Sequence, residues 1–246
     1  MAHGAGGKAS RRLVEGLIVP HLKGGVFING EDVAGYRDTD KDRLLDFLAA
    51  RIYGGNGSRS AYTKTLDAGL AYSNGMRYAL DAGQLRWYAE RVPDLPQTLA
   101  HVISSVKHDP RDASLAQYAL AMALRDARSA QEYEQRAAAM AADLADGLTP
   151  QVVTRFHRAL LDLARMPNLA ETLFARIDRV YAPVLPGYGA PSSMQHRLPF
   201  VIGPEKQFRS YEAYLKSTEG PSTVLYRLFP RDYWQPASVA AKQGVD

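Results

Sequence analysis

The sequence contains no cysteine among its 246 residues. Disulfides, thiolate zinc sites, iron–sulfur clusters and a cysteine nucleophile are therefore excluded. Because cysteine-free proteins suit both reducing and oxidising compartments, this absence leaves the compartment open. No apolar run approaches the roughly 18 residues that indicate a membrane-spanning helix, so we expect no membrane span.

A secretion signal is also lacking. The apolar residues that follow Arg11 and Arg12 are interrupted by Glu15, which makes a poor signal-peptide core. The cytoplasm is therefore the default expectation. The periplasm becomes an alternative if the chain belongs to a longer exported precursor.

The chain also has a small net charge and no long run of like charges. Lysine and arginine number 30 against 26 acidic residues, a net charge of +4, and no run of five or six cations occurs. A nucleic-acid partner is therefore not indicated. Hydrophobic residues make up 46% and charged residues 23%, which is ordinary for a globular protein that buries a sizeable core.

Turn residues, helix caps and hydrophobic spacing predict short strands near both ends and helices between them. Strands are predicted at 26–28, 70–80, 85–89 and 200–202, and helices at 44–53, 60–67, 96–106, 113–148, 150–163, 169–181 and 211–215. This order predicts an α+β fold, in which an antiparallel sheet packs against helices and a helical insertion occupies the second half. We expect an irregular lead-in over 1–25, one α+β domain over 26–220 and an irregular tail over 221–246.

The sequence holds no self-sufficient catalytic constellation. His101 and His108 lie seven positions apart, whereas paired metal ligands on a helix lie three or four apart, so surface histidines are the simpler interpretation. The glycine-rich stretch 54–60 lacks the Lys-Ser/Thr pair of a phosphate-binding loop and follows a helix, which favours a helix–helix turn. Ser104 and Ser105 lie near histidines on the same predicted helix, but no third member of a triad is evident.

Residues 43–91, which read RLLDFLAARIYGGNGSRSAYTKTLDAGLAYSNGMRYALDAGQLRWYAER, carry a family resemblance. The run resembles the pitrilysin/insulinase-type zinc metallopeptidases (peptidase M16-like). In that family a helix leads to a glycine-rich break, a second helix, a strand similar to the Gly-Leu-Ala-Tyr-Ser stretch here, and a return strand. The resemblance is specific over this run and loose over 26–110 and 198–216.

The resemblance implies two halves of similar fold, one catalytic and one non-catalytic, that close around an extended peptide. The catalytic half carries an inverted HxxEH motif, whose glutamate activates a zinc-bound water. That motif is absent here. The chain therefore resembles the C-terminal, non-catalytic half. We expect it to be inactive alone and to hold no cofactor, with zinc in a partner half supplied in cis or in trans.

The resemblance also implies candidate substrate-binding residues. In the family the non-catalytic half contributes an arginine and a tyrosine, spaced seven apart, that reach toward the substrate. The tyrosine corresponds to Tyr72 and the arginine to Thr65, whose hydroxyl can donate only one neutral hydrogen bond. Gly54, Gly55 and Gly57 match in character a loop that some non-catalytic subunits use to handle peptides.

Two further hypotheses stay open. The chain could be a purely structural scaffold of the same fold, which the loss of arginine at Thr65 favours, with Tyr72 a buried strand residue whose hydroxyl meets a backbone carbonyl. An unrelated module that binds nucleotide or nucleic acid rests only on the pI near 9.2 and the glycine-rich loop. The missing catalytic half leads us to expect a fragment of a longer precursor or one gene of a split pair.

Overall fold

The computed structural model describes residues 25–32, 34–54, 60–79, 83–126, 133–145, 147–189 and 199–225. One hydrophobic core cluster contains buried residues from Ala34 through Leu215. The predicted lead-in over 1–25 and the tail over 221–246 lie almost entirely outside the described residues. The proposed domain boundaries therefore stay predictions.

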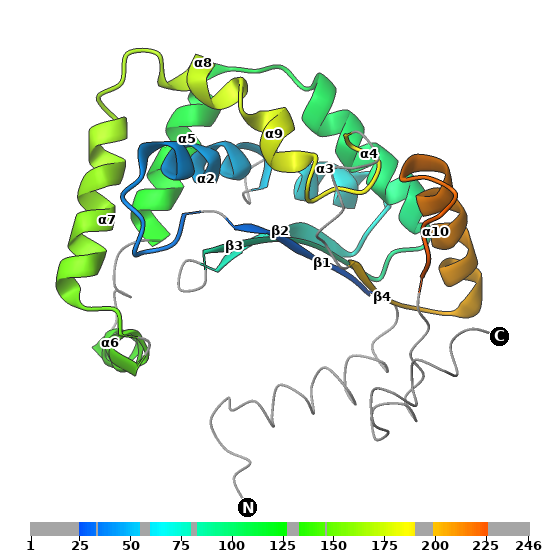
Figure 1. Ribbon diagram of the computed structural model, residues 1–246, viewed down its shortest axis with the longest axis horizontal. Coiled ribbons are helices and arrows are strands. Elements are labelled where there is room, and N and C mark those ends of the chain that lie inside the picture. Colours follow the sequence, from blue (N-terminus) through cyan, green and yellow to red (C-terminus); the bar gives the residue numbers. More distant parts are fainter. Residues whose placement is uncertain are drawn as a thin grey trace, which may run out of the picture.

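Four antiparallel strands form one sheet, and their order is β2-β3-β1-β4. They are β1 (Gly25–Asp32), β2 (Ser73–Ala79), β3 (Gln84–Glu90) and β4 (Pro199–Ile202). All four lie where the sequence predicts strands, although β2 begins three residues later than expected. The outer strands β2 and β4 lie far apart in the sequence. A long helical segment separates β4 from the first three strands, and β4 then completes the sheet beside β1 (Figure 1).

The hairpin of β2 and β3 follows from alternation along each strand. On β3, Leu85, Trp87 and Ala89 are buried, whereas the residues between them are half-buried. This period of two turns every second side chain toward the helices. Gly83 precedes β3 with φ of +62°, a left-handed conformation that glycine adopts without strain.

Nine helices are described, and most of them lie over one side of the sheet (Figure 1). They are α2 (Lys41–Gly54), α3 (Ala61–Asp67), α4 (Leu95–His108), α5 (Ala113–Asp126), α6 (Tyr133–Ala145), α7 (Pro150–Leu163), α8 (Leu169–Phe174), α9 (Ile177–Tyr181) and α10 (Glu205–Thr218). Helices α4 to α9 form the insertion between β3 and β4. The fold is therefore α+β, as the sequence predicts.

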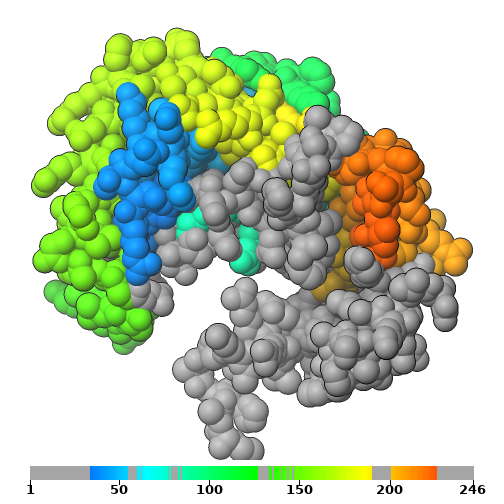
Figure 2. All heavy atoms as spheres, viewed as in Figure 1, coloured from blue at the N-terminus to red at the C-terminus, as the bar shows by residue number. Residues whose placement is uncertain are grey.

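Helix α2 is the centre of the helical layer. It packs against α5, α8, α9 and β2, and Figure 2 shows α8 and α9 (yellow) directly against α2 (blue). Its buried Arg51 pairs with Asp126 of α5 and stacks on the rings of Phe47 and Tyr78. A buried guanidinium needs such a carboxylate partner, so this pair fixes α5 against the α2–β2 contact.

Helix caps explain why several helices begin where the sequence predicts. Ser60 and Thr149 accept hydrogen bonds from the backbone N–H groups of Thr63 and Val152, which opens α3 and α7. These bonds satisfy amides that have no partner within the helix. Asp94 does the same for α4, which starts one residue before Pro96.

Several predicted helix boundaries differ from the structure; α2, for example, begins at Lys41, three residues earlier than predicted. The helix predicted at 169–181 is two helices, because the chain turns at Ala175–Arg176, where Arg176 donates to the carbonyl oxygen of Asp42 on α2. The stretch predicted as helical over 113–148 contains two described helices, α5 and α6, and α6 ends at Ala145, before Gly147 in the left-handed region. The last helix is longer than expected, since α10 begins at Glu205.

Helix α6 has no extensive contact with another described element. Among the helices that the structure describes, none is long and apolar enough to cross a bilayer.

Candidate functional site

Tyr72 lies immediately before the edge strand β2. Its backbone N–H donates to the carbonyl oxygen of Glu90 at 3.2 Å, which continues the ladder with β3. Its side chain is 62% exposed. The alternative interpretation of Tyr72 as a buried strand residue is therefore wrong, and the ring is free to meet a ligand from solvent.

Arg91 stands beside Tyr72 and was not anticipated from the sequence. Its guanidinium carbon lies 4.6 Å from the centroid of the Tyr72 ring, within cation–π range. Arg91 has φ of +52°, and no other non-glycine residue in the described part of the chain has a positive φ. Across the described ranges it has no carboxylate partner. The antiparallel pairing places the end of β3 beside the start of β2. Only this pairing brings Arg91 to Tyr72.

The edge position of β2 adds a second feature to this place. Among the strands that the structure describes, β2 pairs with β3 alone. The backbone groups of an edge strand on its outer side have no strand partner, so such an edge can accept an added extended peptide. Tyr72, Arg91 and the β2 edge together make the candidate site.

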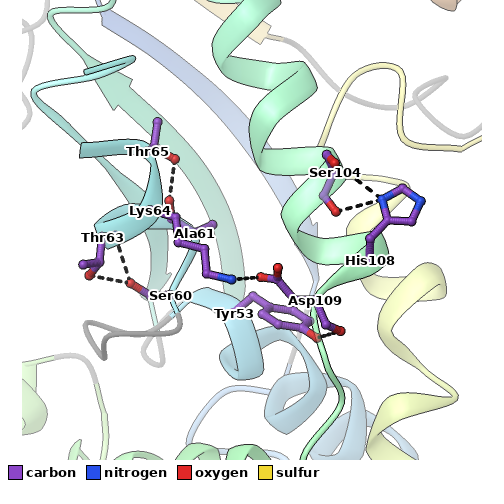
Figure 3. Close-up of polar contacts among 9 residues, drawn as sticks. All are labelled: Tyr53, Ser60, Ala61, Thr63, Lys64, Thr65, Ser104, His108 and Asp109. Atoms are coloured by element: carbon purple, nitrogen blue, oxygen red, sulfur yellow. Dashed lines mark hydrogen bonds and ion pairs between the residues drawn. The ribbon is translucent and has the colours of Figure 1, made fainter. Parts of the chain in front are cut away.

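Thr65 does not join this site. Its side chain is fully buried on α3, and its hydroxyl donates to the carbonyl oxygen of Ala61 (Figure 3). Its own carbonyl accepts from the N–H of Leu70 at 3.0 Å. The position that corresponds to the family's arginine therefore faces the protein interior. The hydroxyl and the carbonyl oxygen of Thr65 are both already used within the fold.

Lys64, the cation next to Thr65, forms an ion pair elsewhere in the fold. Lys64 pairs with the carboxylate of Asp109, just after α4, and the hydroxyl of Tyr53 donates to the backbone oxygen of Asp109 at 3.4 Å (Figure 3). Burial raises the pKa of Tyr53, and the charge of Asp109 adds to this rise. The cluster ties α2, α3 and α4 together and leaves Lys64 unable to replace the missing arginine. Arg59, the other nearby cation, lies outside the described residues.

Gly54 ends α2 in close contact with β2. A Cβ atom there would lie 2.7 Å from Cβ of Met76 and would overlap the hydroxyl of Tyr78. Glycine is thus required by the packing of α2 on the sheet. Gly55 and Gly57 lie outside the described residues, so their role in substrate binding stays a prediction.

Ser104 and His108 on α4 do not form a nucleophile–base pair. Nδ1 of His108 lies 3.0 Å from the backbone oxygen of Ser104 and 3.4 Å from its hydroxyl. Since a carbonyl oxygen only accepts, Nδ1 carries the proton in the shorter contact and cannot take one from the serine. Within the described ranges, no group of three or more metal-ligating side chains could hold a metal ion.

No family model and no curated protein sequence matches this chain. Among solved structures, it is similar to a protein provisionally described as a zinc protease from Bordetella pertussis Tohama I. The TM-score is 0.48 and the identity 14%, over 75% of this chain and 96% of that one. It is also similar to the inactive peptidase domain of a protein provisionally described as a zinc protease from Bordetella parapertussis, with a TM-score of 0.48 and 15% identity over 74% and 91% of the two chains. Likeness at this level transfers no residue role, substrate or partner.

Proposed function

We propose that this chain is the non-catalytic, peptide-binding half of a pitrilysin/insulinase-type zinc metallopeptidase. It holds an extended peptide, and a zinc-bearing half in cis or in trans cleaves it. The observation that carries the proposal is the exposure of Tyr72 at the start of an edge strand, where the resemblance over 43–91 implies the family's substrate-contacting tyrosine.

Peptide binding at this site would use two kinds of contact. The backbone groups on the outer side of β2, which no described strand pairs with, would pair with the peptide backbone, which favours extended and unfolded segments of any sequence. The ring of Tyr72 would stack on a peptide side chain, and the guanidinium of Arg91 would donate to a peptide carbonyl. Arg91 would thus supply the cation that Thr65 lacks.

The test is peptide binding by the wild-type chain and by Tyr72→Ala, measured by fluorescence anisotropy with labelled, unstructured peptides. We expect Tyr72→Ala to weaken binding about fivefold or more, and Arg91→Gln to weaken it by a similar factor. Both side chains are exposed, so the unfolding midpoint should stay close to that of wild type.

Tyr133→Ala is the matched control. Tyr133 is 89% exposed on α6 and also has an arginine, Arg136, beside its ring. An equal loss in Tyr72→Ala and Tyr133→Ala would contradict a site at β2. Stoichiometric zinc on the chain alone, with peptide cleavage abolished by a chelator, would contradict the non-catalytic assignment.

A scaffold subunit of the same fold is the second candidate. The observation that favours it is the burial of Thr65, which removes the family's second substrate contact from the surface. Absence of any affinity of the wild-type chain for unfolded peptides would support this candidate over the first.

A further inference from the structure

A pocket of about 300 Å³ is lined by residues of the helical layer and of the segments that join its helices. It lies where the C-terminal end of α4 meets α9 and the segment that follows α9. Its lining residues are Lys107, Arg111, Asp178, Ala182, Tyr188 and Gly189. Three of the six carry charge, and two of these are cations.

Both cations are held in place without being neutralised. Nζ of Lys107 lies 4.7 Å from the centroid of the Tyr188 ring, and the guanidinium of Arg111 donates to the carbonyl oxygen of Phe174 at 3.3 Å. Among the described residues neither one has a carboxylate within ion-pairing distance. In contrast, Arg176 and Arg179 around α9 both pair with the carboxylate of Asp46.

Tyr188 forms the wall of the pocket. Its side chain is buried, and its hydroxyl donates to Oδ1 of Asp178 at 2.6 Å. Burial raises the pKa of Tyr188, the bond to Asp178 raises it further, and the charge of Arg111 opposes this rise. Tyr188 therefore stays neutral, and one oxygen of the only acidic lining residue is already occupied. The lining as a whole keeps a positive charge.

We propose that this pocket binds the oxyanion of a small molecule, a phosphate or a carboxylate group, between Lys107 and Arg111. Guanidinium and ammonium groups that lack a protein carboxylate are the donors that such an anion prefers. The residues involved come from α4, α9 and the segment after each, so this inference does not depend on peptide binding at β2.

The test is titration of the full chain with inorganic phosphate and, in parallel, with citrate, followed by isothermal calorimetry at low ionic strength. We expect saturable binding with one site per chain for at least one of the two anions. Lys107→Gln and Arg111→Gln should each weaken it about tenfold, because each removes a charge-assisted contact. A response to phosphate alone or to citrate alone would assign the ligand's group to that chemistry.

Two further variants make the result specific. Arg158→Gln removes the same charge from an exposed position on α7 and should leave binding unchanged. Asp178→Asn keeps an acceptor for Tyr188 but removes the negative charge, so binding should become tighter. The proposal is overturned if neither anion binds, if Arg158→Gln weakens binding as much as Arg111→Gln, or if both pocket variants bind like wild type with unchanged unfolding midpoints.

Discussion

Gly54→Ala is expected to destabilise the fold, although alanine is the better helix former. A Cβ atom at this position would lie 2.7 Å from Cβ and 2.8 Å from Cγ of Met76 on β2. It would also overlap the hydroxyl of Tyr78, which donates to the carbonyl oxygen of Ala50 at 2.6 Å. Since Cβ of Met76 is fixed to the strand backbone, α2 and β2 must move apart.

The magnitude follows from three effects. Overpacking of a tight core contact costs about 1–3 kcal/mol. Displacement of the Tyr78 hydroxyl adds about 1 kcal/mol for the lost hydrogen bond. The higher helix propensity of alanine offsets at most about 1 kcal/mol, and less at the last residue of a helix. We therefore expect the free energy of unfolding to fall by about 1–3 kcal/mol, measured by urea denaturation and circular dichroism at constant m-value.

A double-mutant cycle with Tyr78→Phe separates the hydroxyl overlap from the rest. Tyr78→Phe alone should cost no more than about 1 kcal/mol, because the carbonyl of Ala50 also accepts from the hydroxyl of Tyr181 at 2.7 Å. In Gly54→Ala/Tyr78→Phe the overlapping oxygen is gone. The loss should then be smaller than the sum of the single losses by about 0.5 kcal/mol or more.

Gly75→Ala is the matched control on β2. A Cβ atom there would meet its nearest neighbour, Cε1 of Tyr88, at 3.4 Å, which is ordinary contact. Its stability should stay within about 0.5 kcal/mol of wild type. The packing argument is refuted if Gly54→Ala is as stable as wild type, or if Gly75→Ala loses as much.

Two other predictions concern buried polar groups. Asn74 is 2% exposed on β2, and both polar atoms of its side-chain amide lack a hydrogen-bond partner among the described residues. Asn74→Leu, which has a similar shape, should therefore raise the free energy of unfolding by about 1 kcal/mol in urea titrations. A decrease of that size would show that the amide of Asn74 is hydrogen-bonded. Burial raises the pKa of Glu219, which accepts from the N–H of Gly187 at 2.7 Å. The folded state thus binds this proton more tightly, so its contribution to stability is present below the unfolded pKa, 4.5, and is lost as pH rises through the folded pKa. Glu219→Gln should therefore gain in unfolding midpoint relative to wild type as pH rises above the unfolded pKa, 4.5, and the opposite trend would contradict the cause.

Local signals in the sequence determine most of the elements. The strands β1, β3 and β4 and the helices α3 and α7 all lie where the sequence predicts them, and Ser60 and Thr149 cap the two helices. Each depends on residues within a few positions, namely alternating apolar side chains, a cap hydroxyl or a glycine that permits a turn. The α+β class follows from the order of these elements along the chain.

The neighbours of the candidate site residues depend on the tertiary structure. The spacing of Thr65 and Tyr72 matches the pattern that the family resemblance implies, yet the Thr65 side chain is buried and the Tyr72 side chain is exposed. Arg91 reaches Tyr72 only through the pairing of β2 with β3. No spacing in the sequence marks this pair.

The sequence by itself determined the class of fold, the elements and the absence of an HxxEH motif, since these are properties of composition and of short windows of the chain. The tertiary structure decided the strand order, the break between α8 and α9 and the meeting of Lys107, Arg111 and Tyr188 around one pocket. The physical reason is that packing and ion pairing join residues far apart in the chain. The free energy of such contacts depends on the whole fold and leaves no periodic trace in any one segment.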